Sequence, residues 1–286
     1  MNSASRLGLG TVQFGQAYGI SNARGQVPPN EVAAMLARAA DARIGLLDTA
    51  AGYGEAESVL GQIDTRPFRL VTKTIGIRNG LAAVIDRARQ SAETLKRHPV
   101  ELLLVHAAGD LKGPDGRDLW RALLQLRDEG LFGGIGISAY VGEDPAALAA
   151  QFRPAAMQVP FSLLDQRLLR DGSLARMKAL GVEVHTRSAF LQGLLFLDPD
   201  TLPEKLRGAG PHLKRLRAAI AEAGSTALKA ALAFVLMRRE VDVCVVGATA
   251  LSELNEIIDA ANAPAPDIDW AACALDDDVV LTPSLW

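Results

Sequence analysis

Short apolar segments alternate with helical segments along almost the whole chain, and this alternation limits the available folds more than any other feature. Eight of the apolar segments have the length of strands and are continuously apolar, which is typical of parallel strands covered on both faces. They occupy residues 7–15, 44–47, 68–74, 100–105, 135–138, 155–161, 182–188 and 241–246. Apolar residues at helical spacing follow each of them, at 31–42, 55–61, 81–97, 117–129, 145–152, 173–180, 227–239 and 251–261. Repeated strand–helix units predict an α/β fold built on a parallel sheet.

Eight such units are the number that closes a parallel sheet into a (β/α)8 barrel, the TIM barrel. The chain has 286 residues, and such barrels typically need about 250, so we expect residues 1–286 to form a single domain. Segment 189–224 contains three prolines and a basic amphipathic helix near 212–223. Because the alternation resumes after this segment, we interpret it as an insertion. The Pro- and Asp-rich residues 264–286 are expected to form a C-terminal tail.

Composition narrows the classes of partner. The net charge is −3, from 33 acidic and 30 basic residues, which gives no long-range attraction to nucleic acid or to an anionic membrane. The two cysteines, Cys244 and Cys273, form neither a disulfide framework nor a metal motif. We find no signal-peptide segment and no apolar run long enough to span a bilayer. The sequence therefore predicts a cytoplasmic protein, monomeric or weakly homo-oligomeric, whose partner is a small molecule and which uses no metal.

Polar residues follow three of the apolar strands at the point where each strand ends. These residues are Asp48, Lys73 and His106, and Tyr53 comes five residues after Asp48, between two glycines that allow a tight loop. Active sites of (β/α)8 barrels lie at the C-terminal ends of the strands. One polar residue there usually caps or fills the barrel, but an acid, a phenol, an ammonium and an imidazole together indicate acid–base chemistry.

Reduction of a carbonyl by hydride could use each of these groups. The alkoxide that forms must receive a proton, and the Tyr53 phenol can supply it. An adjacent ammonium favours the ionised form of a phenol, which is the role expected of Lys73. Asp48 would pair with Lys73 and hold it in place. His106 would hydrogen-bond the carbonyl oxygen and orient the substrate, or help relay the proton.

The four residues resemble the tetrad of the aldo-keto reductases, which has the order Asp, Tyr, Lys, His and places the first two in a D-x-x-x-x-Y segment. The resemblance covers nearly the whole chain. It implies an NAD(P)(H)-dependent oxidoreductase that interconverts an aldehyde, ketone or sugar with an alcohol and uses Tyr53 as general acid and base. The implied cofactor is NADP(H), with NAD(H) as the alternative.

The resemblance also implies a set of cofactor-binding residues. In the family, a Ser and a Gln hold the nicotinamide carboxamide, which needs both a donor and an acceptor. An aromatic residue there stacks on the nicotinamide, and here a planar guanidinium, which can also stack, stands in its place. A loop before the last helix binds phosphate, as a helix N-terminus can. The matching positions are Ser138, Gln158, Arg187, Ser188, Gly247, Ala248 and Thr249.

The sequence departs from the family pattern at three further positions that bear on the cofactor. The Asn that follows the family's Ser is Ala139, which removes one contact to the carboxamide. Ala248 and Leu254 stand near the places where many members carry Lys and Arg for the 2′-phosphate. We therefore expect weak discrimination, with NADPH favoured over NADH by roughly tenfold or less.

Four aromatic residues are candidates for the substrate pocket: Phe14, Tyr18, Phe161 and Trp286. Phe14 and Tyr18 follow the first strand, where loops at this end of a barrel often carry function. The alternative for both residues is that they only cover the barrel mouth.

Two other functions are compatible with parts of this pattern. One is a nucleotide-binding regulatory protein of the same fold with little turnover, against which the intact tetrad argues. The other is a barrel lyase or isomerase that uses Lys73 as a Schiff base. Lys73 beside Asp48 permits that chemistry, but a Tyr and a His at the family spacing argue for the reductase.

Overall fold

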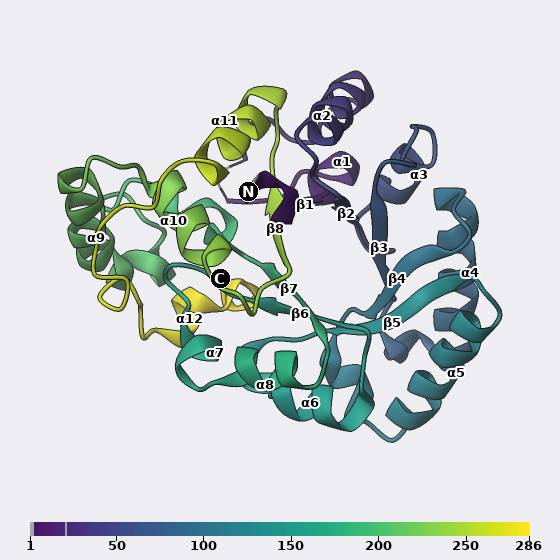
Figure 1. Cartoon of the computed structure of the whole chain (residues 1–286). Helices are drawn as coiled ribbons and strands as arrows, with labels where there is room; N and C mark the ends of the chain where they lie inside the picture. The colour runs from purple at the N-terminus through teal and green to yellow at the C-terminus, as the bar shows by residue number, and fades with distance from the viewer. Residues whose placement is uncertain (1–2, 21) are drawn as a thin grey trace.

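The computed structural model describes residues 3–20 and 22–286, and eight parallel strands follow one another around a closed barrel (Figure 1). The strands are β1 (Leu7–Gly10), β2 (Leu46–Asp48), β3 (Arg69–Lys73), β4 (Val100–Val105), β5 (Phe132–Ser138), β6 (Ala156–Pro160), β7 (Glu183–Arg187) and β8 (Val243–Gly247). Pairing of β8 with β1 closes the ring, with Leu7 opposite Cys244 and Gly10 opposite Gly247. The predicted (β/α)8 barrel is thus confirmed.

Helices surround the ring on its outer side (Figure 1). Each helix expected from the sequence is present, with ends shifted by at most a few residues. Pro29 is the first residue of its helix, where its missing N–H costs nothing. Asp144 caps another helix by accepting a hydrogen bond from the Ala147 N–H at 3.1 Å. These helices are α2 (Pro29–Asp41), α3 (Ala56–Leu60), α4 (Leu81–Leu95), α5 (Gly116–Asp128), α6 (Pro145–Phe152), α8 (Ser173–Ala179), α10 (Ala227–Leu236) and α11 (Leu251–Ala261).

The barrel interior is filled by a small apolar cluster that is separate from the main core. Its members are Leu46, Val71, Leu102, Leu104, Ala156, Val243 and Val245. Glycines make room for these side chains. A Cβ atom on Gly136 would lie 2.4 Å from Leu104 Cδ2 and 2.6 Å from the Ala156 carbonyl oxygen. The interior is therefore packed below the level of the polar residues, as in barrels of this kind.

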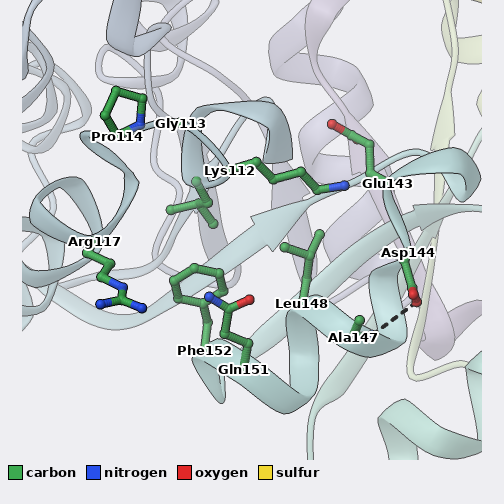
Figure 2. A pocket seen from close by; sticks show the side chains of 11 residues that line it. Lys112, Gly113, Pro114, Arg117, Glu143, Asp144, Ala147, Leu148, Gln151 and Phe152 are labelled. Carbon is green, nitrogen blue, oxygen red and sulfur yellow. Dashed lines mark hydrogen bonds between the residues drawn. The ribbon is translucent and has the colours of Figure 1, made fainter.

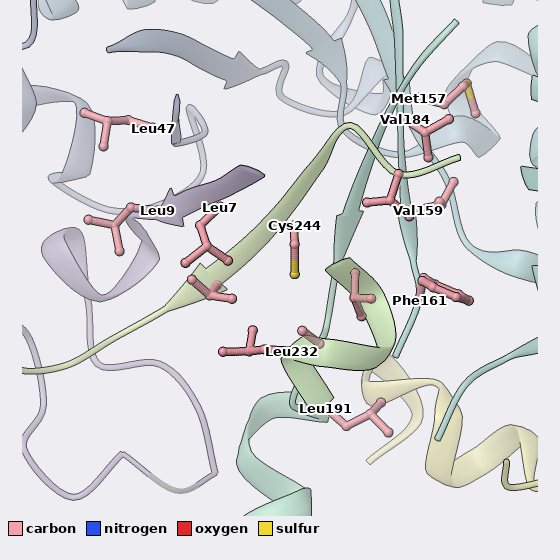
Figure 3. Packing of buried hydrophobic residues seen from close by; sticks show 14 of the residues in the cluster. Leu7, Leu9, Leu47, Met157, Val159, Phe161, Val184, Leu191, Leu232 and Cys244 are labelled. Carbon is pink, nitrogen blue, oxygen red and sulfur yellow. The ribbon is translucent and has the colours of Figure 1, made fainter. Parts of the chain in front are cut away.

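The main core lies between the strands and the helices, because strand side chains point alternately inward and outward. Leu7 and Leu9 of β1 and Cys244 of β8 lie on this side, near Leu232 of α10 (Figure 3). Burial raises the pKa of the Cys244 thiol to about 12, so this cysteine is an inert, buried thiol.

The first strand is shorter than expected. It ends at Gly10, and residues predicted to continue it form the short helix α1 (Val12–Gly15). The chain turns there because it packs against the loop that carries Tyr53. A Cβ atom on Gly15 would lie 1.9 Å from the Tyr53 carbonyl oxygen, so this close approach requires glycine.

The segment interpreted as an insertion contains η5 (Leu191–Phe196), η6 (Glu204–Ala209) and α9 (Gly210–Glu222). The C-terminal tail contains α12 (Asp278–Leu281) and η7 (Pro283–Leu285). Hydrogen bonds connect the two regions: Lys205 Nζ donates to the Leu285 carbonyl at 3.0 Å, and His212 Nε2 lies 3.0 Å from the Cys273 carbonyl. The two regions therefore pack on one another.

Within residues 3–20 and 22–286, no single helix is long and apolar enough to cross a membrane. One bent pair, Glu204–Glu222 with Ala227–Leu236, meets the length and composition criteria together, and its two halves meet at 88°.

Candidate active site

The alternation of side chains along the strands brings the polar residues together at one end of the barrel. Asp48 stands two positions after the interior residue Leu46, and Lys73 stands two positions after the interior residue Val71. Because side chains two apart share a face, both side chains point into the barrel above the apolar filling. The same step of two leads from interior positions to His106, Ser138, Gln158, Arg187 and Gly247.

A cavity of about 940 Å³ lies at this end of the barrel. Three tetrad residues, Asp48, Tyr53 and His106, line it. Most of the residues expected to bind the cofactor also line it, so the structure brings them together. These are Ser138, Gln158, Arg187, Ser188, Gly247 and Thr249.

The Asp48–Lys73 ion pair lies beneath the cavity. The Lys73 ammonium is 2.6 Å from Asp48 Oδ2, and it also donates to the Thr49 carbonyl at 2.9 Å and to the Tyr53 hydroxyl at 3.4 Å. Both charged side chains are buried. Burial alone would lower the pKa of Lys73, but the Asp48 charge and the Tyr53 phenol outweigh it and raise that pKa above its ordinary value. The ammonium next to the phenol therefore remains charged.

Gln158 forms a hydrogen bond with Asp48 of the tetrad. Its Nε2 donates to Asp48 Oδ1 at 2.7 Å. Asp48 thus receives a hydrogen bond on each carboxylate oxygen, one from Gln158 and one from Lys73. This contact fixes the orientation of the carboxylate, and it joins residues that are 110 positions apart in the sequence.

The loop that presents Tyr53 is held by backbone hydrogen bonds and by one glycine. The Ala51 N–H donates to the Lys73 carbonyl at 3.1 Å, and the Tyr53 N–H donates to the Ala50 carbonyl at 3.0 Å. Gly54 has φ +54°, and a Cβ atom on it would lie 2.3 Å from the Gly15 carbonyl oxygen. Of the two glycines beside Tyr53, the following one is therefore the one that the conformation requires.

A buried polar network anchors the same loop from behind. Glu57 of α3, only 3% exposed, accepts from the Thr72 hydroxyl of β3 at 2.5 Å and from Arg87 of α4 at 2.6 Å. Arg87 in turn donates to the Ala51 carbonyl at 3.3 Å. The network connects the Tyr53 loop to the strand that carries the lysine, and nothing in the sequence pattern had indicated it.

His106 lies beside the phenol as a neutral ring. The Tyr53 and His106 ring centroids are 5.8 Å apart at an interplanar angle of 81°. Burial, followed by the charges of Lys73 and Arg187, lowers the pKa of His106 to about 4. At neutral pH the ring can therefore hydrogen-bond a carbonyl oxygen without carrying a charge.

This lowered pKa predicts a pH dependence of stability. Between about pH 6.5 and pH 4 the unfolded chain binds the His106 proton and the folded chain does not, so the free energy of unfolding should fall as the pH drops through this window. In His106→Gln that part of the dependence should vanish. Urea unfolding at a series of pH values measures it, and identical slopes in the two proteins would contradict the prediction.

Arg187 has a partner that the sequence did not indicate. Its guanidinium carbon lies 4.2 Å from the centroid of the Tyr140 ring, and its Nη1 lies 3.4 Å from Ser188 Oγ. Among the described residues that line the cavity, Arg187 is the only basic one. The cavity thus has one positive side chain, at its catalytic end, where it also contributes to the lowered pKa of His106.

Sequence reasoning missed further lining residues. Gln13 follows β1, and its Oε1 is buried without a hydrogen-bond partner. Tyr140, Glu253 and Glu256 also line the cavity. Glu253, in the first turn of α11, could have been recognised as a capping residue, but its position at the cavity depends on the tertiary structure.

Several expected residues lie elsewhere. Phe14 and Phe161 are fully buried in the core, and Phe161 packs on Phe234 of α10 with ring centroids 5.2 Å apart. Phe161 is an odd number of residues from Gln158, so its side chain faces the outer helices. Trp286 donates from Nε1 to the Val279 carbonyl at 2.9 Å and does not line the cavity. Of the four aromatic candidates, only Tyr18 lines it.

Two residues expected in the site lie just below its surface. Ala248 follows the inward-facing Gly247, so its side chain points outward, and it is only 2% exposed. Lys73 is 1% exposed and does not line the cavity. It acts on the site through its contacts with Asp48 and Tyr53.

A second cavity, of about 690 Å³, lies outside the barrel beside α5 and α6 (Figure 2). The Lys112 side chain extends toward Glu143 on one side of it, and Arg117 lies on the other, with Leu148 and Phe152 between them (Figure 2). None of the tetrad residues lines it, so the larger cavity is the candidate active site.

A closed (β/α)8 barrel with a buried Asp–Lys pair, a phenol and a neutral imidazole at its mouth defines a class of barrel enzymes with acid–base chemistry. The family model of the Aldo/keto reductase family matches residues 6–275. The chain therefore belongs to the aldo/keto reductase family. Members of this family generally use NAD(P)H.

Individual relatives are more distant. The chain is 34% identical over 115 residues to 2,5-diketo-D-gluconic acid reductase B from Corynebacterium sp., which covers 38% of this chain and 40% of that protein. It is 30% identical over 182 residues to an aldo-keto reductase from Mycobacterium sp., and this match covers 61% of this chain and 64% of that protein. The chain thus spans less than two thirds of either relative. Its fold is similar to that of an aldo-keto reductase from Bacillus halodurans in its holo form, with a TM-score of 0.71 and 20% identity over 91% of this chain and 87% of that one.

Proposed function

We propose that this protein is an NAD(P)(H)-dependent oxidoreductase that interconverts a carbonyl compound and an alcohol, with Tyr53 as general acid and base. One observation carries the proposal: the Lys73 ammonium lies within reach of both Asp48, at 2.6 Å, and the Tyr53 hydroxyl, at 3.4 Å, at the cavity floor. Such a contact favours loss of the phenol proton at the moment when a substrate oxygen needs it.

The residues around the cavity fit a nicotinamide cofactor. A carboxamide offers two donors and one acceptor. The Gln158 amide nitrogen donates to Asp48, so the amide oxygen would be the atom that accepts a hydrogen bond from the carboxamide. The Ser138 hydroxyl can donate or accept. Gln13 Oε1 is a buried acceptor without a partner. These three side chains would hold the polar groups of the cofactor.

The protein's own part in the reaction is to position and protonate the substrate. The bound cofactor would supply a hydride to the carbonyl carbon. As the carbon–oxygen π bond opens, the oxygen takes the proton of Tyr53, and the resulting phenolate is stabilised by Lys73. Neutral His106 donates a hydrogen bond to the same oxygen and orients the carbonyl. In the reverse direction Tyr53 accepts the alcohol proton.

The contacts of Lys73 also weigh against the Schiff-base alternative. A lysine that attacks a carbonyl must be neutral and accessible. Lys73 is 1% exposed and makes hydrogen bonds to Asp48, Thr49 and Tyr53. Its raised pKa keeps it protonated, so it is suited to holding charge and unsuited to nucleophilic attack.

Cofactor binding and turnover test the proposal together. Titration with NADH and NADPH should quench the intrinsic fluorescence of the protein. A panel of aldehydes, ketones, aldoses and keto sugar acids should then contain a compound that oxidises the bound cofactor. We include keto sugar acids because of the similarity to 2,5-diketo-D-gluconic acid reductase B. Binding without turnover of any compound would favour the regulatory alternative, and absence of binding would refute both.

A further inference from the structure

The cavity extends from the catalytic residues to the loop after β8 and the first turns of α11. At that end it is lined by Gln13, Gly247, Thr249, Glu253 and Glu256. This inference rests on the proposed function. If the nicotinamide lies beside Tyr53, the nicotinamide half of the cofactor fills the catalytic end of the cavity. The adenosine half of the dinucleotide then has to extend toward α11.

Carboxylates of the protein already occupy the donors at the start of α11. Glu253 accepts from the Thr249 N–H at 2.6 Å and from the Thr249 hydroxyl at 3.0 Å. Glu31 of α2 accepts from the Leu251 N–H at 3.2 Å. The sequence had suggested that Gly247, Ala248, Thr249 and this helix N-terminus would serve a phosphate. In the structure two carboxylates accept from the Thr249 and Leu251 donors, and their charge opposes the positive end of the helix.

Arg38 of α2 lies near this end and donates to Asn255 of α11 at 2.7 Å, and within the described residues it forms no ion pair with the two glutamates that line the cavity. Glu31 is paired with Arg24 at 2.9 Å. By contrast, neither Glu253 nor Glu256 forms an ion pair within the part of the chain that the structure describes. Among the described residues that line the cavity, Arg187 is the only Lys or Arg, and it lies at the catalytic end. The far end thus presents two unpaired carboxylates.

These two carboxylates discriminate between the two cofactors for an electrostatic reason. NADP(H) carries an additional phosphate on the ribose 2′-oxygen, and close approach of like charges costs free energy. NAD(H) has a hydroxyl at that position, which can donate a hydrogen bond to a carboxylate, as acidic residues do in other dinucleotide sites. A phosphate would need Lys or Arg there.

We propose that Glu253, together with Glu256, makes this protein selective for NAD(H) over NADP(H). The weak preference for NADPH expected from the sequence is thereby reversed. Ala248 and Leu254 only fail to attract a 2′-phosphate, whereas the glutamates repel it.

Four probes test the selectivity: NADH, NADPH, ADP-ribose and 2′-phospho-ADP-ribose. The last two lack the nicotinamide ring and report on the adenosine end alone. In the wild-type protein, Kd should be lower for NADH than for NADPH by about tenfold or more, and the ADP-ribose pair should show the same order. Higher ionic strength should narrow the gap, because the repulsion is screened.

Variants assign the effect to the glutamates. Glu253→Gln, which keeps an oxygen that can cap Thr249, should narrow the preference by about three- to tenfold, mainly through tighter binding of NADPH. Adding Glu256→Gln should narrow it further. Asp259→Asn is the matched control, because Asp259 is an exposed acid on the same helix that does not line the cavity. It changes net charge equally and should leave the ratio unchanged.

The outcomes separate this inference from the proposed function. Tighter binding of NADPH in the wild-type protein would overturn the inference and leave the oxidoreductase intact; Lys229, next to the lining residue Leu228, would then be the first residue to examine. A Glu253→Gln ratio equal to that of Asp259→Asn would also overturn it. Failure of both NADH and NADPH to bind would instead refute the proposed function, and the inference with it.

Discussion

Tyr53→Phe should retain the fold and bind reduced cofactor as the wild-type protein does, yet turn over carbonyl substrates about 10²–10⁴-fold more slowly, the usual scale for loss of a general acid. The substitution removes the hydroxyl that lies 3.4 Å from Lys73 Nζ and keeps the ring that packs edge-on against His106. Packing should therefore change little, and the loss should appear in kcat.

Single-turnover measurement of cofactor oxidation, with cofactor affinity measured in parallel, checks this expectation. Tyr18→Phe is a suitable control, because Tyr18 also lines the cavity but lies outside the tetrad, with its hydroxyl 3.0 Å from Gln192 Nε2. Near wild-type turnover by Tyr53→Phe would show that another group supplies the proton.

Lys73→Met should impair both catalysis and stability. The phenol loses its neighbouring positive charge, so hydride transfer should slow by a factor at least comparable to that for Tyr53→Phe. In addition, Asp48 is left as a buried carboxylate without its cation. Breaking a buried ion pair by removing one partner typically costs about 3–5 kcal/mol, and the 1% exposure of Lys73 places this pair in that class.

A second substitution separates the two effects. In Lys73→Met combined with Asp48→Asn, no unpaired buried charge remains, so much of the lost free energy of unfolding should return while turnover stays low. Lys178→Met is the control, because its pair with Asp242 is about one-third exposed and should matter little to stability. Denaturant unfolding and single-turnover kinetics provide the two readouts.

Covalent trapping at Lys73 also distinguishes the reductase from a lyase that forms a Schiff base. Treatment with borohydride in the presence of substrate should leave the intact mass unchanged. A substrate mass added to Lys73 would refute the reductase mechanism, since it would require a neutral, nucleophilic amine.

The barrel itself could be read from the sequence because its causes are local. Continuous apolar strands, helical spacing and their repetition are properties of short segments, and α11 begins and ends at the predicted residues, Leu251–Ala261. The presence of Asp48, Lys73 and His106 at strand ends is likewise a local property, and a parallel barrel places all strand ends at one rim. Their assembly at one end of the barrel, with Asp48 and His106 lining the cavity and Lys73 beneath it, followed from the fold class alone.

Side-chain direction beyond the strand ends depended on contacts between distant segments. The sequence suggested Phe161 and Trp286 as pocket residues. In the structure, the alternation of side chains along β6 turns Phe161 outward onto Phe234, and Trp286 hydrogen-bonds the Val279 carbonyl within the C-terminal tail. The α1 turn forms because Gly15 must approach the Tyr53 loop, which no local propensity encodes.

The sequence by itself therefore determined the barrel, since periodicity is carried by neighbouring residues, and its resemblance to the aldo-keto reductases indicated the family that the family model confirms. Only the tertiary structure decided how the site is charged and braced. It set Gln158 against Asp48 across 110 residues, buried Glu57 with Arg87 behind the Tyr53 loop, and placed Glu253 over the Thr249 N–H. Hydrogen bonds and ion pairs act over a few ångströms in space, and the residues that make them across a barrel can be far apart along the chain.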